Sequence, residues 1–353
     1  MAVPEPHVPQ YSPAALNMTN HRFWRLNKRP VDNDYAAALS LESEVVPSPG
    51  DGEVLIRNDY LSMDAGVRMW MTPRTDGYNP PIPLGAKMMG LNLGRVVSSR
   101  AEGFKTGDLV RCFGQWAEYS LVRPELSSLV IVDETVGDIR QHFGALGMNA
   151  WTAYGGLVDY VKIQPGETIV VSAAAGATGS LACQIARNLG CKVIGIAGSD
   201  EKTRFLTDEL GIAKAINYKT QDVEAELAKV EGGINVYFEN VGGPILDAVL
   251  PNMALHGRIA VCGLIAGYKG DEAAPGPARF DQVLMKRLTI IGIFLPDFMD
   301  RRTTYAPVLR KWLDEGKLKI SFDETKGLEN TLVAFERMMT GKNSGKVIVD
   351  IRA

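Results

Sequence analysis

Small residues recur at fixed spacing in one short run of the chain. Ala174, Gly176 and Gly179 match the positions of the three glycines in the fingerprint G-x-G-x-x-G, with alanine in the first place. Glycine in the second and third places lets a backbone approach a pyrophosphate and lets a helix pack closely on a strand. The N–H groups at the start of that helix would then face the phosphates. An ordinary Gly/Ala-rich turn of an α/β domain is the alternative interpretation.

The elements around this turn favour the dinucleotide interpretation. An apolar run at 168–171 has the length of a parallel strand buried on both faces. Leu181, Ile185 and Leu189 recur every four residues after the turn, which is typical of a helix with one apolar face. A second apolar run at 193–196 completes a strand–turn–helix–strand unit, the context in which the fingerprint is specific.

Further downstream, strands and helices alternate. Strands are expected at 213–217, 235–238, 258–262 and 288–295, and helices at 201–210, 222–230, 244–255 and 305–315. Such alternation predicts an α/β fold with a doubly wound parallel sheet and right-handed crossovers. We assign this Rossmann-type domain to residues 145–324.

The first part of the chain has a different pattern. Short strands are expected at 53–57, 94–97, 108–111 and 116–122, separated by Pro- and Gly-rich turns. Closely spaced strands of this kind predict a small, partly open barrel. We assign this mainly β domain to residues 1–144, with residues 325–353 returning to it through a helix at 328–340 and a strand at 346–351.

Charge and composition exclude several classes of protein. The 353 residues carry a net charge of −3 without a basic or acidic block, which argues against nucleic acid and anionic membrane surfaces as partners. No apolar run is long enough to span a bilayer. The polar, Pro-rich residues 1–13 lack the layout of a signal peptide, so we expect a cytosolic, cytoplasmic protein.

Cysteine and histidine are few and scattered. No pair among the four cysteines and four histidines has the spacing of metal ligands, so the sequence predicts neither a structural nor a catalytic zinc. Free, buried thiols are the expected state of the cysteines.

The end of the second predicted strand bears on the choice of dinucleotide. Enzymes that use NAD place a carboxylate there to hold the ribose hydroxyls. Here the strand ends in Gly198 and Ser199, which leaves room for a phosphate, and Lys202 follows within one helical turn. A solvated helix lysine beside Asp200 and Glu201 is the alternative, and NADH as a weaker second cofactor stays open.

Several ordered motifs carry a resemblance that covers nearly the whole chain. They are residues 60–64 (YLSMD), 146–148 (LGM) with 152–154 (TAY), 171–176 (VSAAAG), 198–202 (GSDEK), 240–243 (NVGG), 262–268 (CGLIAGY) and 341–346 (GKNSGK). The chain resembles the zinc-independent medium-chain dehydrogenases/reductases, with a Rossmann domain and a GroES-like domain. Within them it is most similar to the prostaglandin/leukotriene-type reductases, plant alkenal double-bond reductases and bacterial curcumin reductase.

The resemblance implies an NADPH-dependent oxidoreductase that saturates the carbon–carbon double bond of an α,β-unsaturated ketone or aldehyde. It also implies which residues contact NADP(H). They are Met148, Thr152, Gly176, Ala177, Thr178, Gly179, Ser199, Lys202, Tyr218, Asn240, Cys262, Gly263, Leu264, Tyr268, Ile293, Phe294, Leu295 and Asn343. Of these, Lys202 and Tyr218 would meet the adenosine 2′-phosphate, and Asn343 would reach back from the terminal segment.

The predicted mechanism follows from which groups the sequence supplies. Without zinc or a Ser/Tyr/Lys triad, reduction of a carbonyl to an alcohol lacks an obvious proton donor. Reduction of an enone needs only hydrogen-bond donors at the carbonyl oxygen, where an enolate forms after hydride reaches the β-carbon. Tyr268 is the candidate catalytic donor; a tyrosine that only packs on the cofactor is the alternative.

A substrate pocket is expected between the two domains. The apolar and aromatic residues that could line it are Tyr60, Met63, Trp70, Tyr78 and Phe298. They would suit a small hydrophobic enone or alkenal.

This chain departs from the family pattern near the substrate. Relatives usually read D-P-Y-M-R where this chain has Asp64, Ala65, Gly66, Val67 and Arg68, so an aromatic side chain that faces the substrate in some members is absent. Substrate identity is therefore not carried over by the resemblance.

Two other activities and one binding role stay open. A quinone reductase, an alcohol dehydrogenase or a non-catalytic NADPH-binding protein could use the same fold. The apolar run at 288–294 would be an exposed sheet edge in a monomer, and pairing of two such edges predicts a homodimer.

Overall fold

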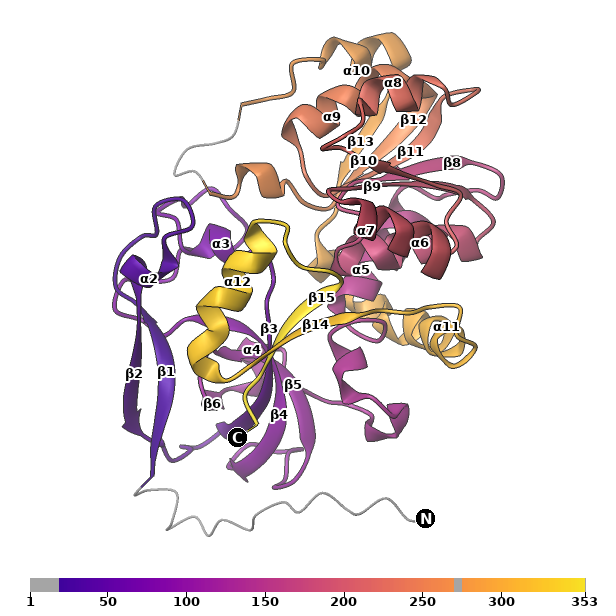
Figure 1. Ribbon diagram of the computed structural model, residues 1–353. Coiled ribbons are helices and arrows are strands. Elements are labelled where there is room, and N and C mark those ends of the chain that lie inside the picture. The colour runs from indigo at the N-terminus through magenta and orange to yellow at the C-terminus, as the bar shows by residue number, and fades with distance from the viewer. Residues whose placement is uncertain (1–18, 270–274, 353) are drawn as a thin grey trace.

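The Gly-rich turn lies at the centre of a six-stranded parallel sheet. The computed structural model describes residues 19–269 and 275–352, and in it the strand order is β10-β9-β8-β11-β12-β13 (Figure 1). The strands are β8 (Thr168–Val171), β9 (Lys192–Ala197), β10 (Lys214–Asn217), β11 (Ile234–Glu239), β12 (Met253–Val261) and β13 (Thr289–Gly292). In chain order this is 3-2-1-4-5-6, the doubly wound order of dinucleotide-binding sheets, whose direction of winding switches between β8 and β11.

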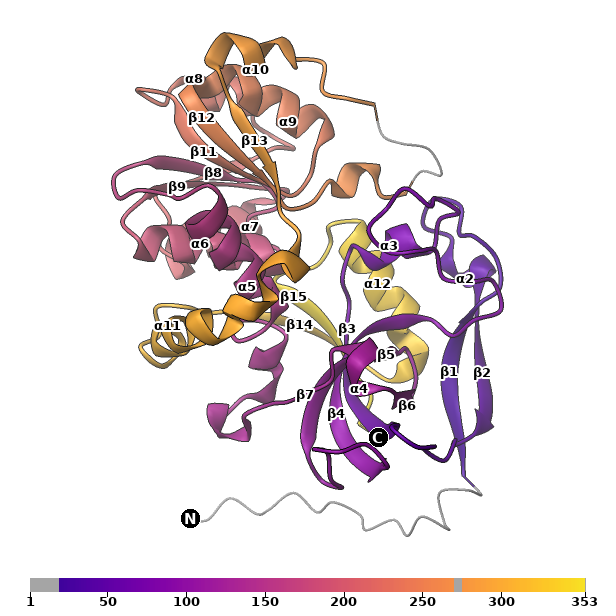
Figure 2. The ribbon, with the colours of Figure 1, turned by 180° about the vertical axis from the view of Figure 1, so that it is seen from behind.

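Alternate strand residues face opposite sides of this sheet, and both sides are covered by helices (Figures 1 and 2). Ile169 and Val171 pack with α5 (Met148–Gly155), α6 (Ala177–Asn188) and α11 (Arg302–Asp314). Val170, between them, packs with residues of α8 (Val223–Ala228) and α9 (Gly243–Val249), and α10 (Asp281–Lys286) joins this side. Burial of each such side chain stabilises the fold by about 2 kcal/mol. The continuous apolar runs of the sequence are therefore explained by burial on two faces.

The first part of the chain, joined by two strands from the C-terminal end, forms a seven-stranded sheet, and β1 and β2 form a separate two-stranded sheet. The long strand β3 pairs with β4, β6 and β15, so the sheet bends around it. The strands are β1 (Asn20–Leu26), β2 (Leu39–Val45), β3 (Val54–Ser62), β4 (Met89–Ser99), β5 (Leu109–Gln115), β6 (Tyr119–Val122), β7 (Val130–Ile131), β14 (Phe322–Lys326) and β15 (Lys346–Asp350). The predicted fold class, a Rossmann domain plus a mainly β domain, is confirmed.

Short helices complete the connections. They are α2 (Tyr35–Ala38), α3 (Val67–Trp70), α4 (Pro124–Ser127), η1 (Glu134–Val136), η2 (Ile139–His142), η3 (Gly156–Tyr160), α7 (Asp200–Arg204), η4 (Phe205–Glu209), η5 (Leu250–Asn252), η6 (Ile265–Gly267), η7 (Leu295–Arg301), η8 (Leu328–Asn330) and α12 (Thr331–Met339). The predicted helix at 201–210 is thus α7 continued by the wider turns of η4.

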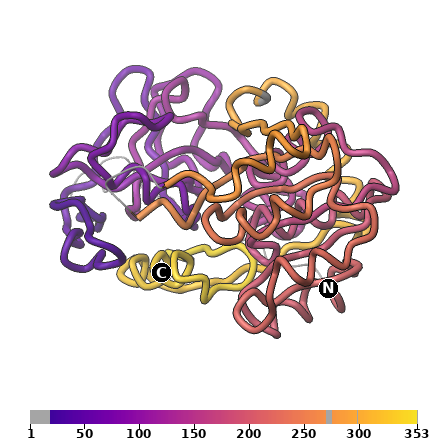
Figure 3. The backbone as a smooth tube through the Cα atoms, turned by 90° about the horizontal axis from the view of Figure 1, so that it is seen from above, coloured from indigo at the N-terminus to yellow at the C-terminus, as the bar shows by residue number. Residues whose placement is uncertain are grey.

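The C-terminal segment returns to the sheet of the first domain. β15 lies between β14 and β3, and α12 packs beside it (Figure 1). From above, the same segment, drawn in yellow, lies next to the indigo N-terminal part (Figure 3). The C-terminal segment joins the sheet of the first domain from Phe322 onward. The division of the chain into domains at residues 144 and 325 stays a prediction.

Several predicted boundaries were wrong. The strand expected at 116–122 begins only at Tyr119, and the strands expected at 53–57 and 94–97 are longer than predicted. The helix expected at 244–255 ends earlier, and β12 begins at Met253, because Pro251 has no N–H to continue a helix. The strand expected at 288–295 stops at Gly292, and the chain turns into η7 at Leu295, with Pro296 in its first turn.

Residues 1–13, on which the expectation of no signal peptide rests, lie outside the described residues. None of the helices formed by residues 19–269 and 275–352 combines the length and apolar character that a membrane crossing requires.

Candidate active site

The Gly-rich turn connects β8 directly to α6. Gly176 precedes the helix in extended conformation, and no side chain caps the first turn, so its N–H groups are available to a ligand. A β-carbon added at Gly179 would lie 2.3 Å from the carbonyl oxygen of Ala173, so only glycine allows this contact between helix and turn. At Gly176 the same added atom would lie 3.2 Å from that oxygen. The turn therefore provides what a pyrophosphate requires: close backbone approach and free amides.

A cleft of about 570 Å³ opens above the turn, at the carboxyl edge of the parallel sheet. Ligands of doubly wound sheets bind at this edge. Thirteen of the residues singled out from the sequence line it: Met63, Tyr78, Gly176, Ala177, Thr178, Gly179, Lys202, Tyr218, Asn240, Cys262, Gly263, Tyr268 and Asn343. The volume is within the usual range for small-molecule and cofactor sites.

Just beyond the end of β9, Gly198, Lys202 and Tyr218 line the cleft. The Tyr218 ring lies over Gly198, where an added β-carbon would be 2.8 Å from the phenol oxygen. Lys202 lines the cleft beside it and donates to the carbonyl oxygen of Gly341 at 2.7 Å. Burial, and then the positive charge of Lys219, lower the pKa of Lys202. Lys202 therefore places a positive charge in the cleft, with that of Lys219 nearby, and this favours an anionic ligand.

Asp200, the acidic residue near Lys202 that could favour NADH, is already hydrogen-bonded within the protein. Asp200 accepts a hydrogen bond from the side-chain amide of Asn217 at 2.7 Å. Ser199 caps α7 by accepting from the backbone N–H of Lys202, and it does not line the cleft. This geometry supports the phosphate role predicted for Lys202.

Replacement of Lys202 by alanine should raise the KM for NADPH about tenfold to a hundredfold, because a charge-assisted phosphate contact contributes about 1.5–3 kcal/mol. The KM for NADH, which has no 2′-phosphate, should change less than about twofold. Initial rates with both cofactors measure the effect, with Lys192→Ala as the control, because Lys192 is the exposed first residue of β9. An equal loss for both cofactors would contradict the prediction.

Asn240 is fixed by a network at the switch between β8 and β11. Its backbone N–H donates to the Ser172 hydroxyl at 2.8 Å, and its side-chain amide donates to the Ser172 carbonyl at 2.7 Å. The Ser172 hydroxyl in turn donates to the fully buried carboxylate of Glu239 at 2.8 Å. The amide oxygen of Asn240 takes no part in these two bonds, and the residue lines the cleft.

The terminal segment closes the cleft from the other domain. The backbone N–H of Gly345 donates to the carbonyl of Ala175, next to the Gly-rich turn, at 3.0 Å. Asn343 is held by its side-chain amide, which donates to the Gly345 carbonyl at 3.0 Å. This contact explains how a residue near the C-terminus reaches a turn far away in sequence.

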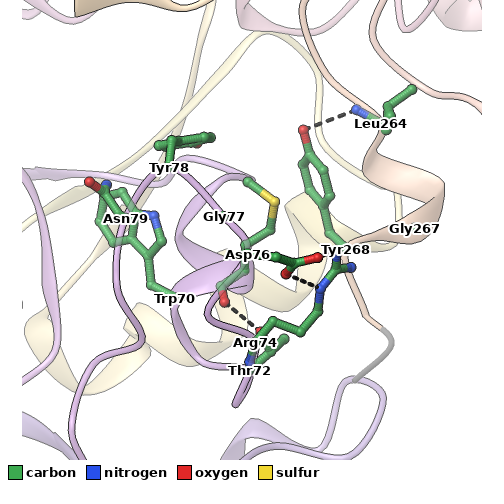
Figure 4. A pocket seen from close by; sticks show the side chains of 11 residues that line it. Trp70, Thr72, Arg74, Asp76, Gly77, Tyr78, Asn79, Leu264, Gly267 and Tyr268 are labelled. Carbon is green, nitrogen blue, oxygen red and sulfur yellow. Dashed lines mark hydrogen bonds and ion pairs between the residues drawn. The ribbon is translucent and has the colours of Figure 1, made fainter. Parts of the chain in front are cut away.

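A second cavity of about 280 Å³ adjoins the cleft (Figure 4). Its walls are Met69, Trp70, Thr72, Arg74, Asp76, Gly77, Tyr78, Asn79, Leu264, Gly267 and Tyr268. Arg74 and Asp76 form a forked ion pair at 2.9 Å on its polar side. Tyr78 and Tyr268 line both cavities and stand on opposite sides of the second one.

The Tyr268 hydroxyl is oriented by the backbone. It accepts a hydrogen bond from the N–H of Leu264 at 3.0 Å, which leaves its own proton free to be donated (Figure 4). Burial raises the pKa of Tyr268 to about 12, and Tyr78, Cys262 and Glu239 add to the rise against the opposing Leu264 N–H. The phenol is therefore a neutral donor at physiological pH.

Other residues named from the sequence lie away from the cleft lining. Tyr60 is 3% exposed in the core of the first domain, because it packs with Leu91, Leu93 and Ile348. Those that line neither cavity are Tyr60, Met148, Thr152, Ser199, Ile293, Phe294 and Leu295. The side chain of Phe298 lies outside the described residues.

Sequence reasoning missed several residues of the cleft. Asn149 donates to the Thr178 hydroxyl at 2.9 Å, so it joins the start of α5 to that of α6. Asp64 and Lys346 line the cleft as an ion pair, and the Lys346 ammonium, 1% exposed, also donates to the carbonyl of Met63 at 3.0 Å. The only signal for Asn149 in the sequence was its position, directly after Met148 of a matched motif.

Among the residues that the structure describes, no three His, Cys, Asp or Glu side chains lie close enough together to hold a metal ion. Burial raises the pKa of the Cys262 thiol in the cleft to about 12.

The doubly wound sheet, the glycine turn at its switch point and Lys202 in the cleft beyond β9 define a dinucleotide-binding protein. Comparison with known proteins agrees with this class of protein. Residues 22–130 match the family described as the N-terminal domain of oxidoreductase, and residues 177–313 match the one described as zinc-binding dehydrogenase.

Individual relatives are similar over nearly the full length. The NADPH-dependent curcumin reductase of Escherichia coli (strain K12) is 36% identical over 94% of this chain and 97% of its own. The NADP(+)-dependent 2-alkenal reductase of Nicotiana tabacum is 36% identical over 92% of this chain and 97% of its own. The crystal structure of CurA in complex with NADPH from Vibrio vulnificus has a TM-score of 0.88 at 36% identity, covering 94% of this chain and 99% of that one.

The chain therefore belongs to the NADPH-dependent double-bond reductase family of the medium-chain dehydrogenase/reductase superfamily. The resemblance seen in the sequence is confirmed, and NADP(H) is the cofactor of this family, as predicted.

Proposed function

We propose that this protein reduces the carbon–carbon double bond of α,β-unsaturated ketones or aldehydes with NADPH. The Tyr268 hydroxyl carries the proposal: it lies where the dinucleotide cleft meets a second, partly aromatic cavity, and the Leu264 N–H leaves its proton free. The curcumin and 2-alkenal reductase relatives support the same substrate class.

The residues present fit the cofactor. Gly176–Gly179 would hold the pyrophosphate, Lys202 and Tyr218 the 2′-phosphate, and Asn240 and Asn343 other polar groups along the cleft. When bound, NADPH supplies a hydride to the β-carbon of the substrate.

The chain's own part is to stabilise the charge that develops at the carbonyl oxygen. A neutral phenol donates a hydrogen bond to the forming enolate, and such a donor contributes several kcal/mol in a site with little water. Water or Tyr268 then delivers a proton to the α-carbon. The substrate class proposed is a small hydrophobic enone or alkenal, with no nucleic acid or membrane partner, and the predicted cytosolic location stays a prediction.

The test is a substrate panel with purified protein. Cyclohexenone, benzylideneacetone and hexenal should each oxidise NADPH and yield the saturated carbonyl compound, identified by mass spectrometry. Menadione as hydride acceptor with NADPH tests for quinone reductase activity, and simple alcohols as hydride donors to NADP+ test for alcohol dehydrogenase activity. Turnover of menadione alone, or stoichiometric NADPH binding without oxidation by any acceptor, would overturn the proposal.

The outer edge of the parallel sheet supports the predicted homodimer. β13 ends the sheet, Ile290 on it is 43% exposed, and Leu284 and Met285 on neighbouring α10 are also exposed. Proteins rarely leave an apolar edge strand unpaired, so we propose that two copies pair through β13 across a two-fold axis.

Ile290→Lys should convert the dimer to a monomer, because it places a charge within the apolar contact. Sedimentation velocity at micromolar concentration measures this, and Val333→Lys is the control, because Val333 lies on the exposed face of α12. A wild-type protein that sediments as a monomer would refute the proposed dimer.

A further inference from the structure

Two tyrosines form the boundary between the dinucleotide cleft and the second cavity. Tyr78 and Tyr268 are the aromatic residues that line both, one from each domain. In Figure 4 the two rings stand on opposite sides of the second cavity. These two side chains therefore lie where the two cavities meet.

Tyr78 lies against a glycine that the backbone does not require. Gly66 has φ −59° and ψ −26°, an ordinary right-handed conformation open to any residue. A β-carbon at position 66 would lie 3.0 Å from the Tyr78 hydroxyl oxygen. The missing side chain at position 66 is thus explained by space, because the Tyr78 hydroxyl occupies it.

The other side of the Tyr78 ring is also held. It packs on Phe294, just beyond β13, with ring centroids 5.0 Å apart and a tilt of 49°. An offset aromatic pair of this kind contributes about 0.5–1.5 kcal/mol beyond burial. The ring therefore has one aromatic contact, with Phe294, although the side chain as a whole is 54% exposed.

We propose that Tyr78, seated over Gly66 and against Phe294, is a specificity-determining residue that limits how large a substituent can pass from the cleft into the second cavity. The inference rests on the proposed enone reductase function and deepens it. The ring, rather than the hydroxyl, forms this wall, and Gly66 and Tyr78 are coupled because a side chain at position 66 would crowd the Tyr78 hydroxyl.

The experiment compares kcat/KM for benzylideneacetone, which has an aryl group, with that for cyclohexenone, which is small. Tyr78→Ala should raise the ratio of benzylideneacetone to cyclohexenone about tenfold, since a pocket wall of this size contributes 1–3 kcal/mol of discrimination. Tyr78→Phe, which keeps the ring, should leave the ratio within about threefold of wild type.

The coupling is tested by exchange of the two side chains. Gly66→Tyr alone should lose at least about tenfold in kcat/KM for both substrates, because the new ring collides with Tyr78. In the Gly66→Tyr/Tyr78→Ala double variant, the ratio should return to within about threefold of wild type. Gly276→Tyr is the matched control, since an added β-carbon at Gly276 meets nothing within 4 Å.

The inference would be overturned if Tyr78→Ala left the ratio of kcat/KM for benzylideneacetone to that for cyclohexenone unchanged. It would also be overturned if Gly66→Tyr lowered kcat/KM equally in the presence and absence of the Tyr78 side chain. NADPH binding and the melting temperature show whether each variant is folded, and Tyr78→Leu replaces Tyr78→Ala where that variant is not.

If no enone is reduced by the wild type, the proposed function fails, but the wall is still tested by binding. Benzylideneacetone should then bind NADP+-loaded Tyr78→Ala about tenfold more tightly than the NADP+-loaded wild type, by calorimetry. Equal affinity would overturn the inference independently.

Discussion

Replacing Gly179 by alanine is expected to abolish measurable NADPH binding at micromolar cofactor. The added β-carbon would lie 2.3 Å from the carbonyl oxygen and 2.9 Å from the carbonyl carbon of Ala173. Both are backbone atoms that cannot rotate away, so α6 must move off the turn at a cost of about 3 kcal/mol. The N–H groups that would hold the pyrophosphate then move with the helix.

The effect is measured as the Kd for NADPH by fluorescence, together with the melting temperature. Gly176→Ala provides a graded comparison, because its added β-carbon would lie 3.2 Å from the same oxygen and needs only a small adjustment. Gly276→Ala, with open space around it, should behave as wild type. A folded Gly179→Ala protein that binds NADPH like wild type would show that this close contact does not hold the cofactor.

The sequence predicted this half of the molecule well because its signals are local. The strand, the glycine turn and the first helix follow one another within residues 168–188, and each apolar run is explained by burial against helices on two faces. A predicted helix boundary was wrong where a single residue interrupted a longer helical pattern. Pro251 ended a helix inside an otherwise helical run.

The substrate side could be predicted only in part, because its geometry comes from residues far apart in the chain. Asp64 and Lys346 are 282 positions apart, yet they form an ion pair in the cleft. The relation of Gly66 to Tyr78 depends on how the segment after α3 folds back, which no local pattern records. Tyr60, by contrast, belongs to a well-matched motif but is packed in the core. Aromatic character alone did not separate pocket from core.

Tyr268→Phe is expected to lower kcat for enone reduction about a hundredfold, the usual contribution of a positioned proton or hydrogen-bond donor. The KM for NADPH should change less than about twofold, because the ring and its packing are kept. Tyr119→Phe, whose ring lines neither cavity, is the control.

Since the pKa of Tyr268 is raised to about 12, the hydroxyl stays protonated below that pH, and wild-type kcat should not fall through loss of this proton before about pH 10. Full kcat in the phenylalanine variant would assign Tyr268 to packing, and the enolate oxygen would then have to be stabilised by other donors.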